Sequence, residues 1–259
     1  MGSAWSRRCI LLGLSTSRPS DKDRRIARLK RWVAAPLAAA GLAATGIVIT
    51  ALPLFGAKSF EVVGNHRVSD ARVIREAGLA RGTNVFWFRG GPAGRLLERD
   101  PWLASATVTR RLPSTIRISV VERRPSSRVH VGSTWVLVAS DGTVLGFTGH
   151  KPRLPSLPAT GSLTVGTRNR TLAAPARVAA GLDPWLRSRV TSVSSLPDGQ
   201  LVLELTSGTR VLFGLPTQVR AKDRALTGIV RWAARTKKRF AYVDLRAPLA
   251  PVARAVAGT

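Results

Sequence analysis

The residues that most often perform chemistry are few in this chain and form no recognisable catalytic pattern. Cys9 is the only cysteine, and the three histidines are His66, His130 and His150, of which no two have the i,i+4 spacing of a helical metal site. The sequence also lacks Ser-x-x-Lys, Gly-x-Ser-x-Gly and a phosphate-binding glycine loop. We therefore predict no catalytic residue, no metal and no cofactor.

Two aspartates remain as acidic candidates, and both are better explained by local turns. Asp141 is followed by Gly142, a common hairpin turn pair, and Asp183 is explained by a turn before Pro184. An enzyme needs a nucleophile, a base or a metal set, and this sequence shows none. We predict a protein that is not an enzyme, has no small-molecule substrate and works by binding.

An uncharged stretch determines where such a protein would work. Residues 32–57 contain 26 residues without a charge, enough for a helix of about 39 Å, which exceeds the roughly 30 Å of a bilayer core. Five basic residues lie within 24–31, so the positive-inside rule predicts one transmembrane helix with a cytoplasmic N-terminus. Residues 1–31 are interpreted as a disordered basic tail. A cleaved signal and a buried soluble helix are the alternatives.

The net charge of +27 raises the question of nucleic-acid binding. Residues 1–31 carry nine basic and two acidic residues, or +7 of this charge, which leaves +20 for the residues after the apolar stretch. Most of the positive charge is thus expected outside the cytoplasm, in short scattered clusters. This distribution predicts an anionic envelope or an acidic partner surface, and no nucleic acid.

Residues 58–125 have the pattern of a small α+β domain. An alternating strand at Phe60–Val63 precedes a short helix capped by Ser69, and Pro92 opens a second helix. Two alternating strands follow, around 106–109 and 116–121. The order strand, helix, helix, strand, strand favours helices packed on one face of a sheet.

Residues 126–246 are expected to form a mixed, sheet-rich β-domain. Its expected elements are a hairpin around Asp141-Gly142, a helical stretch at 172–189, strands at 190–193, 201–205 and 210–213, a helix at 217–238 and a last strand at 240–246. Residues 247–259 are interpreted as a flexible C-terminal tail.

A family resemblance rests on several short segments in a fixed order. They are Phe60-Glu-Val-Val-Gly-Asn65, Gly82-Thr-Asn-Val-Phe86, Pro101-Trp-Leu103, Arg110-Arg-Leu-Pro113 and Ile116 to Pro125. They resemble a POTRA domain. One POTRA unit directly after one predicted span is similar to the cell-division family FtsQ, also called DivIB, and the terminal Tyr242-Val-Asp-Leu-Arg246 segment matches as well.

The resemblance implies a partner-binding strand. In this family the last strand of the second domain docks FtsB, which is bound to FtsL. By position this assigns partner binding to Tyr242, Val243, Asp244, Leu245 and Arg246. An unpaired sheet edge would suit such docking, because it exposes backbone N–H and C=O groups. The family has an aromatic residue next, where this chain has Ala247-Pro248, and the alternative is that the segment only closes the core.

Taken together, the sequence predicts a single-pass protein of the cell membrane, located at the division septum. It would act as a scaffold that binds FtsB and FtsL and thereby regulates septal peptidoglycan synthesis by other enzymes. The alternative is a POTRA-bearing export or outer-membrane assembly chaperone. Such proteins usually carry several POTRA units or a barrel, whereas this sequence shows one unit.

Overall fold

The computed structural model describes residues 36–48, 55–159 and 161–256 of two units, Met1–Pro53 and Leu54–Thr259. In the first unit, residues 36–48 are α-helical and exposed. Within the described ranges, no helix has the length and apolar character needed to cross a bilayer. The predicted tail (1–31) and residues 32–35 and 49–54 of the predicted span lie outside the described residues, so the membrane span stays a prediction.

The end of the predicted span belongs to the first folded domain. Gly56 forms an antiparallel bridge with Asn84, and Ala57 is buried in the core of that domain. The Ala57 N–H donates to the Thr83 carbonyl at 2.8 Å. The domain therefore starts before Lys58, where the sequence pattern placed its boundary, because backbone pairing with the 83–85 loop draws these small residues into the fold.

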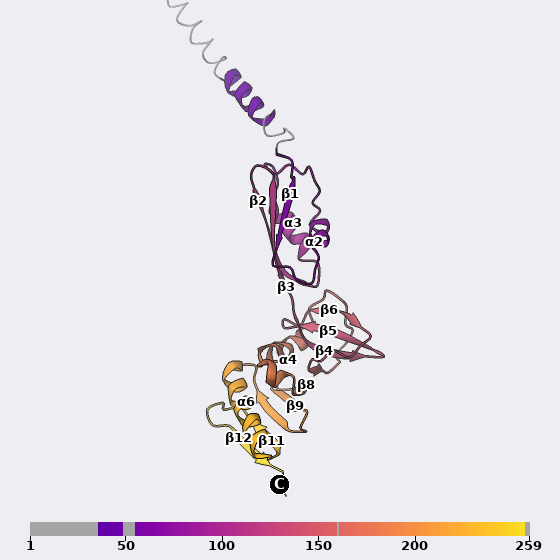
Figure 1. Ribbon diagram of the computed structural model, residues 1–259, viewed down its shortest axis with the longest axis vertical. Helices are drawn as coiled ribbons and strands as arrows, with labels where there is room; N and C mark the ends of the chain where they lie inside the picture. The colour runs from indigo at the N-terminus through magenta and orange to yellow at the C-terminus, as the bar shows by residue number, and fades with distance from the viewer. Residues whose placement is uncertain (1–35, 49–54, 160, 257–259) are drawn as a thin grey trace, which may run out of the picture. The chain divides into compact units, whose positions relative to one another are not determined.

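The first domain contains the predicted order of elements around one core (Figure 1). They are β1 (Ser59–Val63), α2 (Asp70–Glu76), α3 (Gly90–Leu97), β2 (Leu103–Arg111) and β3 (Thr115–Glu122). The sheet order is β1-β3-β2, with β1 parallel and β2 antiparallel to β3. Alternating residues of β3, Ile116, Ile118 and Val120, are buried beneath the helices, as period-two patterning requires.

Local contacts in this domain differ from the expected ones at two places. Ser69 is the N-cap residue of α2, but its side chain makes no capping hydrogen bond. The loop before it is held instead by the Glu122 carboxylate, which accepts the backbone N–H groups of residues 66–68 at 2.8–3.0 Å. Helix α3 begins at Gly90, two residues before Pro92, where Gly90 lies directly on the Val108 carbonyl of β2.

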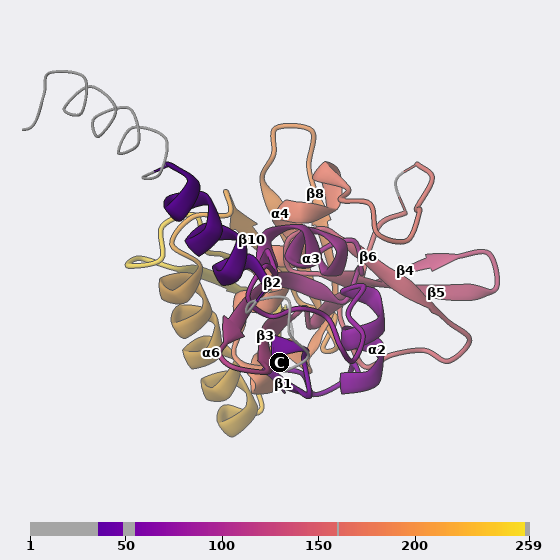
Figure 2. The ribbon, with the colours of Figure 1, turned by 90° about the horizontal axis from the view of Figure 1, so that it is seen from above.

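The second domain is built on a nine-stranded sheet within the described residues. Its order is β12-β11-β10-β9-β8-β7-β4-β5-β6, and the β4–β5 hairpin projects from it (Figures 1 and 2). The strands are β4 (Pro125–Val131), β5 (Thr134–Ala139), β6 (Val144–Thr148), β7 (Ser156–Leu157), β8 (Val190–Ser195), β9 (Leu201–Leu205), β10 (Arg210–Gly214), β11 (Phe240–Asp244) and β12 (Val252–Ala255). The helices are α4 (Arg170–Gly181), α5 (Pro184–Arg187) and α6 (Val219–Thr236).

One face of this sheet supports the core. Leu172 of α4, Leu226 of α6 and Phe213 of β10 are fully buried in a single apolar cluster. Helix α6 is amphipathic, and its apolar side, which includes Leu226, packs against this cluster. Burial of the apolar side stabilises the helix more than its intrinsic propensity does.

Two expectations for the second domain were wrong. The helical stretch 172–189 is interrupted, because Asp183 caps a new helix by accepting the Trp185 N–H at 2.9 Å and Pro184 occupies its first turn. The tail expected to be flexible contains strand β12, antiparallel to β11. The open side of β11 offers backbone hydrogen bonds, and β12 satisfies them.

Candidate partner-binding interface

The predicted docking segment lies inside the sheet rather than at its edge. Strand β11 pairs in parallel with β10, with Val243 opposite Val211. On its other side β11 pairs with β12, with Val243 opposite Ala253. The expectation of an unpaired edge at Tyr242–Arg246 is therefore wrong, since both sides of the strand are already hydrogen bonded.

The five predicted residues divide between the two faces of the sheet. Val243 and Leu245 are buried in the core, and the Leu245 N–H donates to the Leu212 carbonyl at 2.8 Å. Tyr242 and Asp244 are partly exposed and Arg246 is exposed. Alternation along β11 places Tyr242 and Asp244 on the face opposite α6, and Arg246 follows the end of the strand. The two apolar residues close the core, as the alternative interpretation predicted.

The three outward residues form one local network. Arg246 donates to the Asp244 carboxylate through Nη2 at 2.7 Å and through its backbone N–H at 2.9 Å. The side-chain hydrogen bond from Arg246 is the main reason that the pKa of Asp244 lies below its usual value, and a hydrogen bond from Tyr242 adds to the effect. The ion pair between Arg246 and Asp244 fixes the turn after β11. The Tyr242 hydroxyl lies beside this neutralised pair.

Strand β12 supplies the edge that sequence reasoning missed. All four of its residues are exposed, and among the described strands it pairs only with β11. The Val256 N–H bonds inward to the Arg239 carbonyl at 3.0 Å. Because N–H groups alternate along a strand, those of Ala255 and Ala253 point to the open side. The only sequence signal was the short Val-Ala-Arg-Ala alternation after Pro251, too brief to predict a strand.

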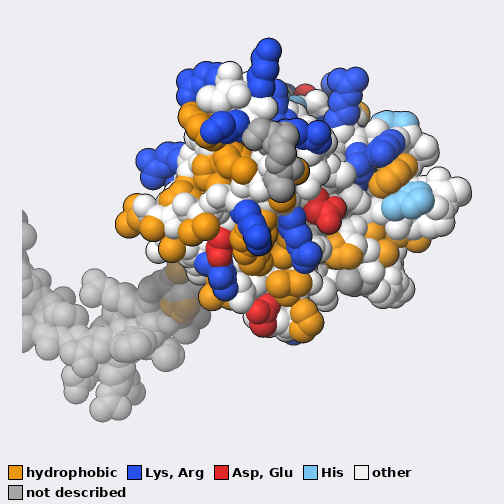
Figure 3. All heavy atoms as spheres, turned by 90° about the horizontal axis from the view of Figure 1, so that it is seen from below, with side chains coloured by type: hydrophobic (Ala, Val, Ile, Leu, Met, Phe, Trp, Pro, Cys, Tyr) orange, Lys and Arg blue, Asp and Glu red, His pale blue; other side chains and the backbone are white. Residues whose placement is uncertain are grey.

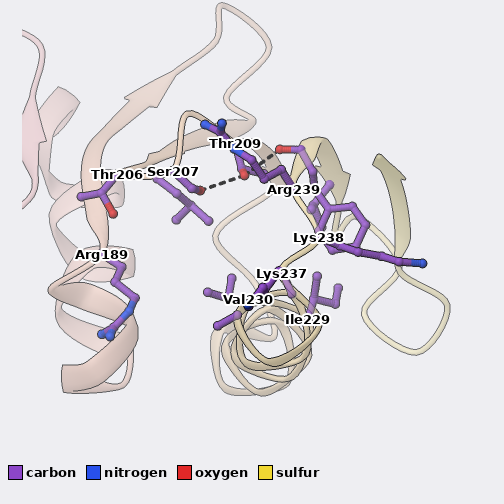
Figure 4. A pocket seen from close by; sticks show the side chains of 14 residues that line it. Arg189, Thr206, Ser207, Thr209, Ile229, Val230, Lys237, Lys238 and Arg239 are labelled. Carbon is purple, nitrogen blue, oxygen red and sulfur yellow. Dashed lines mark hydrogen bonds between the residues drawn. The ribbon is translucent and has the colours of Figure 1, made fainter. Parts of the chain in front are cut away.

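A groove of about 310 Å³ lies between α6 and the side of β11 that faces it (Figure 4). Apolar side chains of α6 and β11, including Ile229, Val230 and Val243, line it. Thr209 Oγ1 donates to the Phe240 carbonyl at 2.7 Å at its border. The remaining lining side chains include four cations and no acid: Arg189, Lys237, Lys238 and Arg239. The groove offers apolar contact within a positive rim and no nucleophile paired with a base.

The acidic candidates occupy structural positions. The Asp141 carboxylate accepts the Thr143 N–H and contacts Arg123 Nε, both at 3.0 Å. Burial would raise the pKa of Asp141, but these hydrogen bonds outweigh it and hold the pKa below its usual value. Asp183 caps α5. Both side chains thus make the turn contacts expected of them.

The three histidines have different local surroundings. The His130 ring lies 4.3 Å from that of Trp135, and His150 Nδ1 lies 2.8 Å from the Thr148 hydroxyl. His66 is exposed in the loop held by Glu122. In the part of the chain that the structure describes, no group of three or more His, Cys, Asp or Glu side chains could hold a metal ion.

On the face of the molecule seen from below, positive charge is spread widely rather than gathered in one stripe (Figure 3). The space-filling view from below shows Lys and Arg side chains between apolar ones, with few acidic side chains among them (Figure 3). Such a surface favours anionic counterparts over a wide area. It does not by itself mark a nucleic-acid groove.

Comparison with known proteins matches both domains in order. Residues 55–123 match the POTRA domain of FtsQ type, and residues 127–246 match the C-terminal domain of cell division protein FtsQ/DivIB. The chain belongs to the FtsQ/DivIB family. This family is one of cell division proteins, and the FtsQ-type description separates this POTRA domain from the export-chaperone alternative.

Individual FtsQ and DivIB proteins show the same relationship at low identity. FtsQ of Corynebacterium glutamicum is 34% identical over 80 residues, which cover 31% of this chain and 36% of that protein. FtsQ of Mycobacteroides abscessus is 24% identical over 204 residues, which cover 79% of this chain and 64% of that protein. The matches thus span about a third to two thirds of these relatives.

A solved structure from the family also matches in part. The major extracytoplasmic domain of DivIB from Geobacillus stearothermophilus is 17% identical, with 44% of this chain and 92% of that chain covered. Its TM-score is 0.32. The family assignment rests on the two matched domains.

Proposed function

We propose that this FtsQ/DivIB chain is a non-enzymatic scaffold of the bacterial division machinery. It binds the FtsB–FtsL pair at the septum and thereby regulates septal peptidoglycan synthesis by other enzymes. The observation that carries the proposal is the pair of matched family domains, in order, from residue 55 to residue 246. The uncharged stretch from residue 32 to the start of the POTRA domain at residue 55 would hold both domains just outside the cell membrane, with the N-terminus in the cytoplasm.

The docking mode in this proposal is strand addition at the sheet edge. A strand of the partner would pair with the open side of β12, through backbone groups such as those of Ala253 and Ala255. Tyr242, Asp244 and Arg246 would then flank it on the exposed face of the sheet. Val243 and Leu245 contribute by holding β11 against α6 rather than by touching the partner.

A proline at the outward position of β12 tests this mode. Ala253→Pro removes one open N–H and places a ring on the edge, while the inward pairing of Arg254 with Tyr242 is kept. Ala253→Val is the matched control, because it retains the N–H. We expect the proline variant to weaken capture of purified FtsB–FtsL by about tenfold or more, at unchanged circular dichroism, and the valine variant to bind normally. Equal binding by both variants would refute docking at β12.

The cellular part of the proposal needs a separate measurement. A fluorescent protein fused to the N-terminus should gather at the division septum. Protease added to cells whose wall has been removed, but whose membrane is unbroken, should cut the chain after the predicted span and leave the N-terminal fluorescent protein uncut. A uniform cytoplasmic signal or a fully protected chain would overturn the localisation.

A further inference from the structure

One end of the POTRA domain brings together three segments that are distant in sequence. We call it the entry end and define it as residues 55–58, 80–89 and 110–115. The Val85 N–H donates to the Phe55 carbonyl at 2.7 Å. The Arg110 guanidinium donates to the Phe86 carbonyl. The strand register joins Ser59 and Arg111 to Thr115, so the β2–β3 turn lies at the same end.

The entry end exposes large apolar side chains that the core does not need. Trp87 is 58% exposed and Leu112 is 55% exposed, each at the tip of its loop. Phe86 lies between Phe55 and Trp87, with ring centroids 5.8 Å and 5.3 Å apart in edge-to-face geometry. A ring cluster that supports an exposed tryptophan presents it in a defined position at the surface, which marks an interaction site more than a scattered apolar residue would.

Charge at this end is of one sign. The three segments contain five basic residues and no acidic residue, and all five are exposed: Lys58, Arg81, Arg89, Arg110 and Arg111. The nearest carboxylate on the sheet, Glu61, lies 3.6 Å from both Arg111 and Arg117. The other acids of the domain lie outside these three segments, and several of them are paired: Asp70, Glu76, Glu98, Asp100 and Glu122.

We propose that the entry end rests on an anionic lipid surface. Trp87 and Leu112 would lie at the level of the headgroups, and the surrounding Arg and Lys side chains would contact lipid phosphates. Tryptophan favours this interface because its ring is apolar while its N–H can stay hydrated. Each basic side chain near an anionic surface adds attraction that falls with salt.

The choice of lipid over a protein partner follows from chain connectivity and charge. The 26 uncharged residues of the predicted span end at Ala57, so the entry end is the part of the domain covalently next to that stretch. The proposal uses the anchor of the proposed function but not its division role. Contact between the entry end and lipid would fix the orientation of the POTRA domain relative to the membrane.

A single-cysteine probe tests this in the full chain. In a Cys9→Ser background, Leu112→Cys and Phe147→Cys each carry one environment-sensitive fluorophore. The two native side chains are equally exposed, at 55%, but Phe147 lies on β6 of the second domain. The chain is reconstituted into vesicles of phosphatidylcholine alone or mixed with phosphatidylglycerol, and flotation of the same samples measures membrane insertion.

We expect a blue shift and quenching by lipid-borne quenchers at position 112 in the anionic vesicles, and neither change at position 147. Arg89→Gln and Arg111→Gln should each lower the ratio of lipid-contacting to free probe by about fivefold, and Trp87→Ser should lower it further. A floated chain without a shift at position 112 would overturn the surface contact and leave the anchor standing. A shift that persists in both vesicle types and after the Arg changes would show that the contact depends neither on anionic lipid nor on these side chains, and would also overturn the proposal. A chain that floats with neither vesicle type would overturn the membrane anchor together with the surface contact, and would leave the division role to its own test.

Discussion

Truncation of Leu245 distinguishes a core role from a partner-binding role for the terminal strand segment. This side chain is 0% exposed in the cluster that contains Val211, Phe213 and Leu226. Full burial of a leucine contributes about 1.5–3 kcal/mol, and the cavity left by Leu245→Ala adds to the loss. We expect a loss of about 3 kcal/mol in the free energy of unfolding, which corresponds to roughly 6–12 °C in Tm for a unit of this size.

The matched control is Leu249→Ala, the same substitution four residues later at a side chain that is 98% exposed. It should change stability by less than about 0.5 kcal/mol. Both variants are compared by urea unfolding followed through tryptophan fluorescence, to which Trp185 and Trp232 of the second domain contribute. If Leu245→Ala unfolds like the unaltered chain while losing FtsB–FtsL, the segment binds the partner through this side chain and the core assignment is wrong.

Two further predictions concern the POTRA domain. Glu122→Gln should cost about 2 kcal/mol, because three backbone N–H groups lose a charged acceptor. Burial would raise the pKa of Glu122, but these N–H groups lower it overall, so its contribution is present above the unfolded pKa of about 4.3 and is lost as pH falls through the lower folded value. Urea midpoints of the glutamine variant should therefore vary less with pH below about pH 4 than those of the unaltered chain; parallel curves would contradict this. Gly90→Ala would place a Cβ 1.8 Å from the Val108 carbonyl oxygen, a backbone atom that cannot rotate away, whereas Gly91→Ala meets only the end of the Arg95 side chain at 3.6 Å. We expect about 3 kcal/mol of destabilisation for the first and none for the second, by thermal unfolding; equal Tm values would show that α3 can move off the sheet.

The sequence predicted most elements because their signals are local. Period-two alternation identified β3, and Asp141-Gly142 identified the turn between β5 and β6. Strand β4 was missed because its inner part, Ser126 to Val129, is buried on both faces and therefore does not alternate. The break between α4 and α5 was not predicted, because helical spacing of apolar residues continues across Asp183. The side chain of Asp183 nevertheless caps a new helix, α5, after α4 has ended.

The predicted docking segment, Tyr242–Arg246, shows what the alternation of residues along a strand can and cannot predict. Alternation alone implies that Val243 and Leu245 share one face and Tyr242, Asp244 and Arg246 the other. It does not say which face meets α6, nor whether the strand has one neighbour or two. That depends on β12, whose four exposed residues carry almost no patterning and form a strand only because β11 offers them hydrogen bonds.

By itself, then, the sequence determined the family, the order of the two domains and most of the strands and turns, because these follow from the spacing of residues along the chain. Tertiary structure alone decided that the open edge is β12 rather than β11, that two of the five predicted residues are core, and that Trp87 and Leu112 share a basic end with the start of the domain. These features arise from pairing between segments tens of residues apart. Backbone hydrogen bonds and burial select such pairs, and no local pattern encodes them.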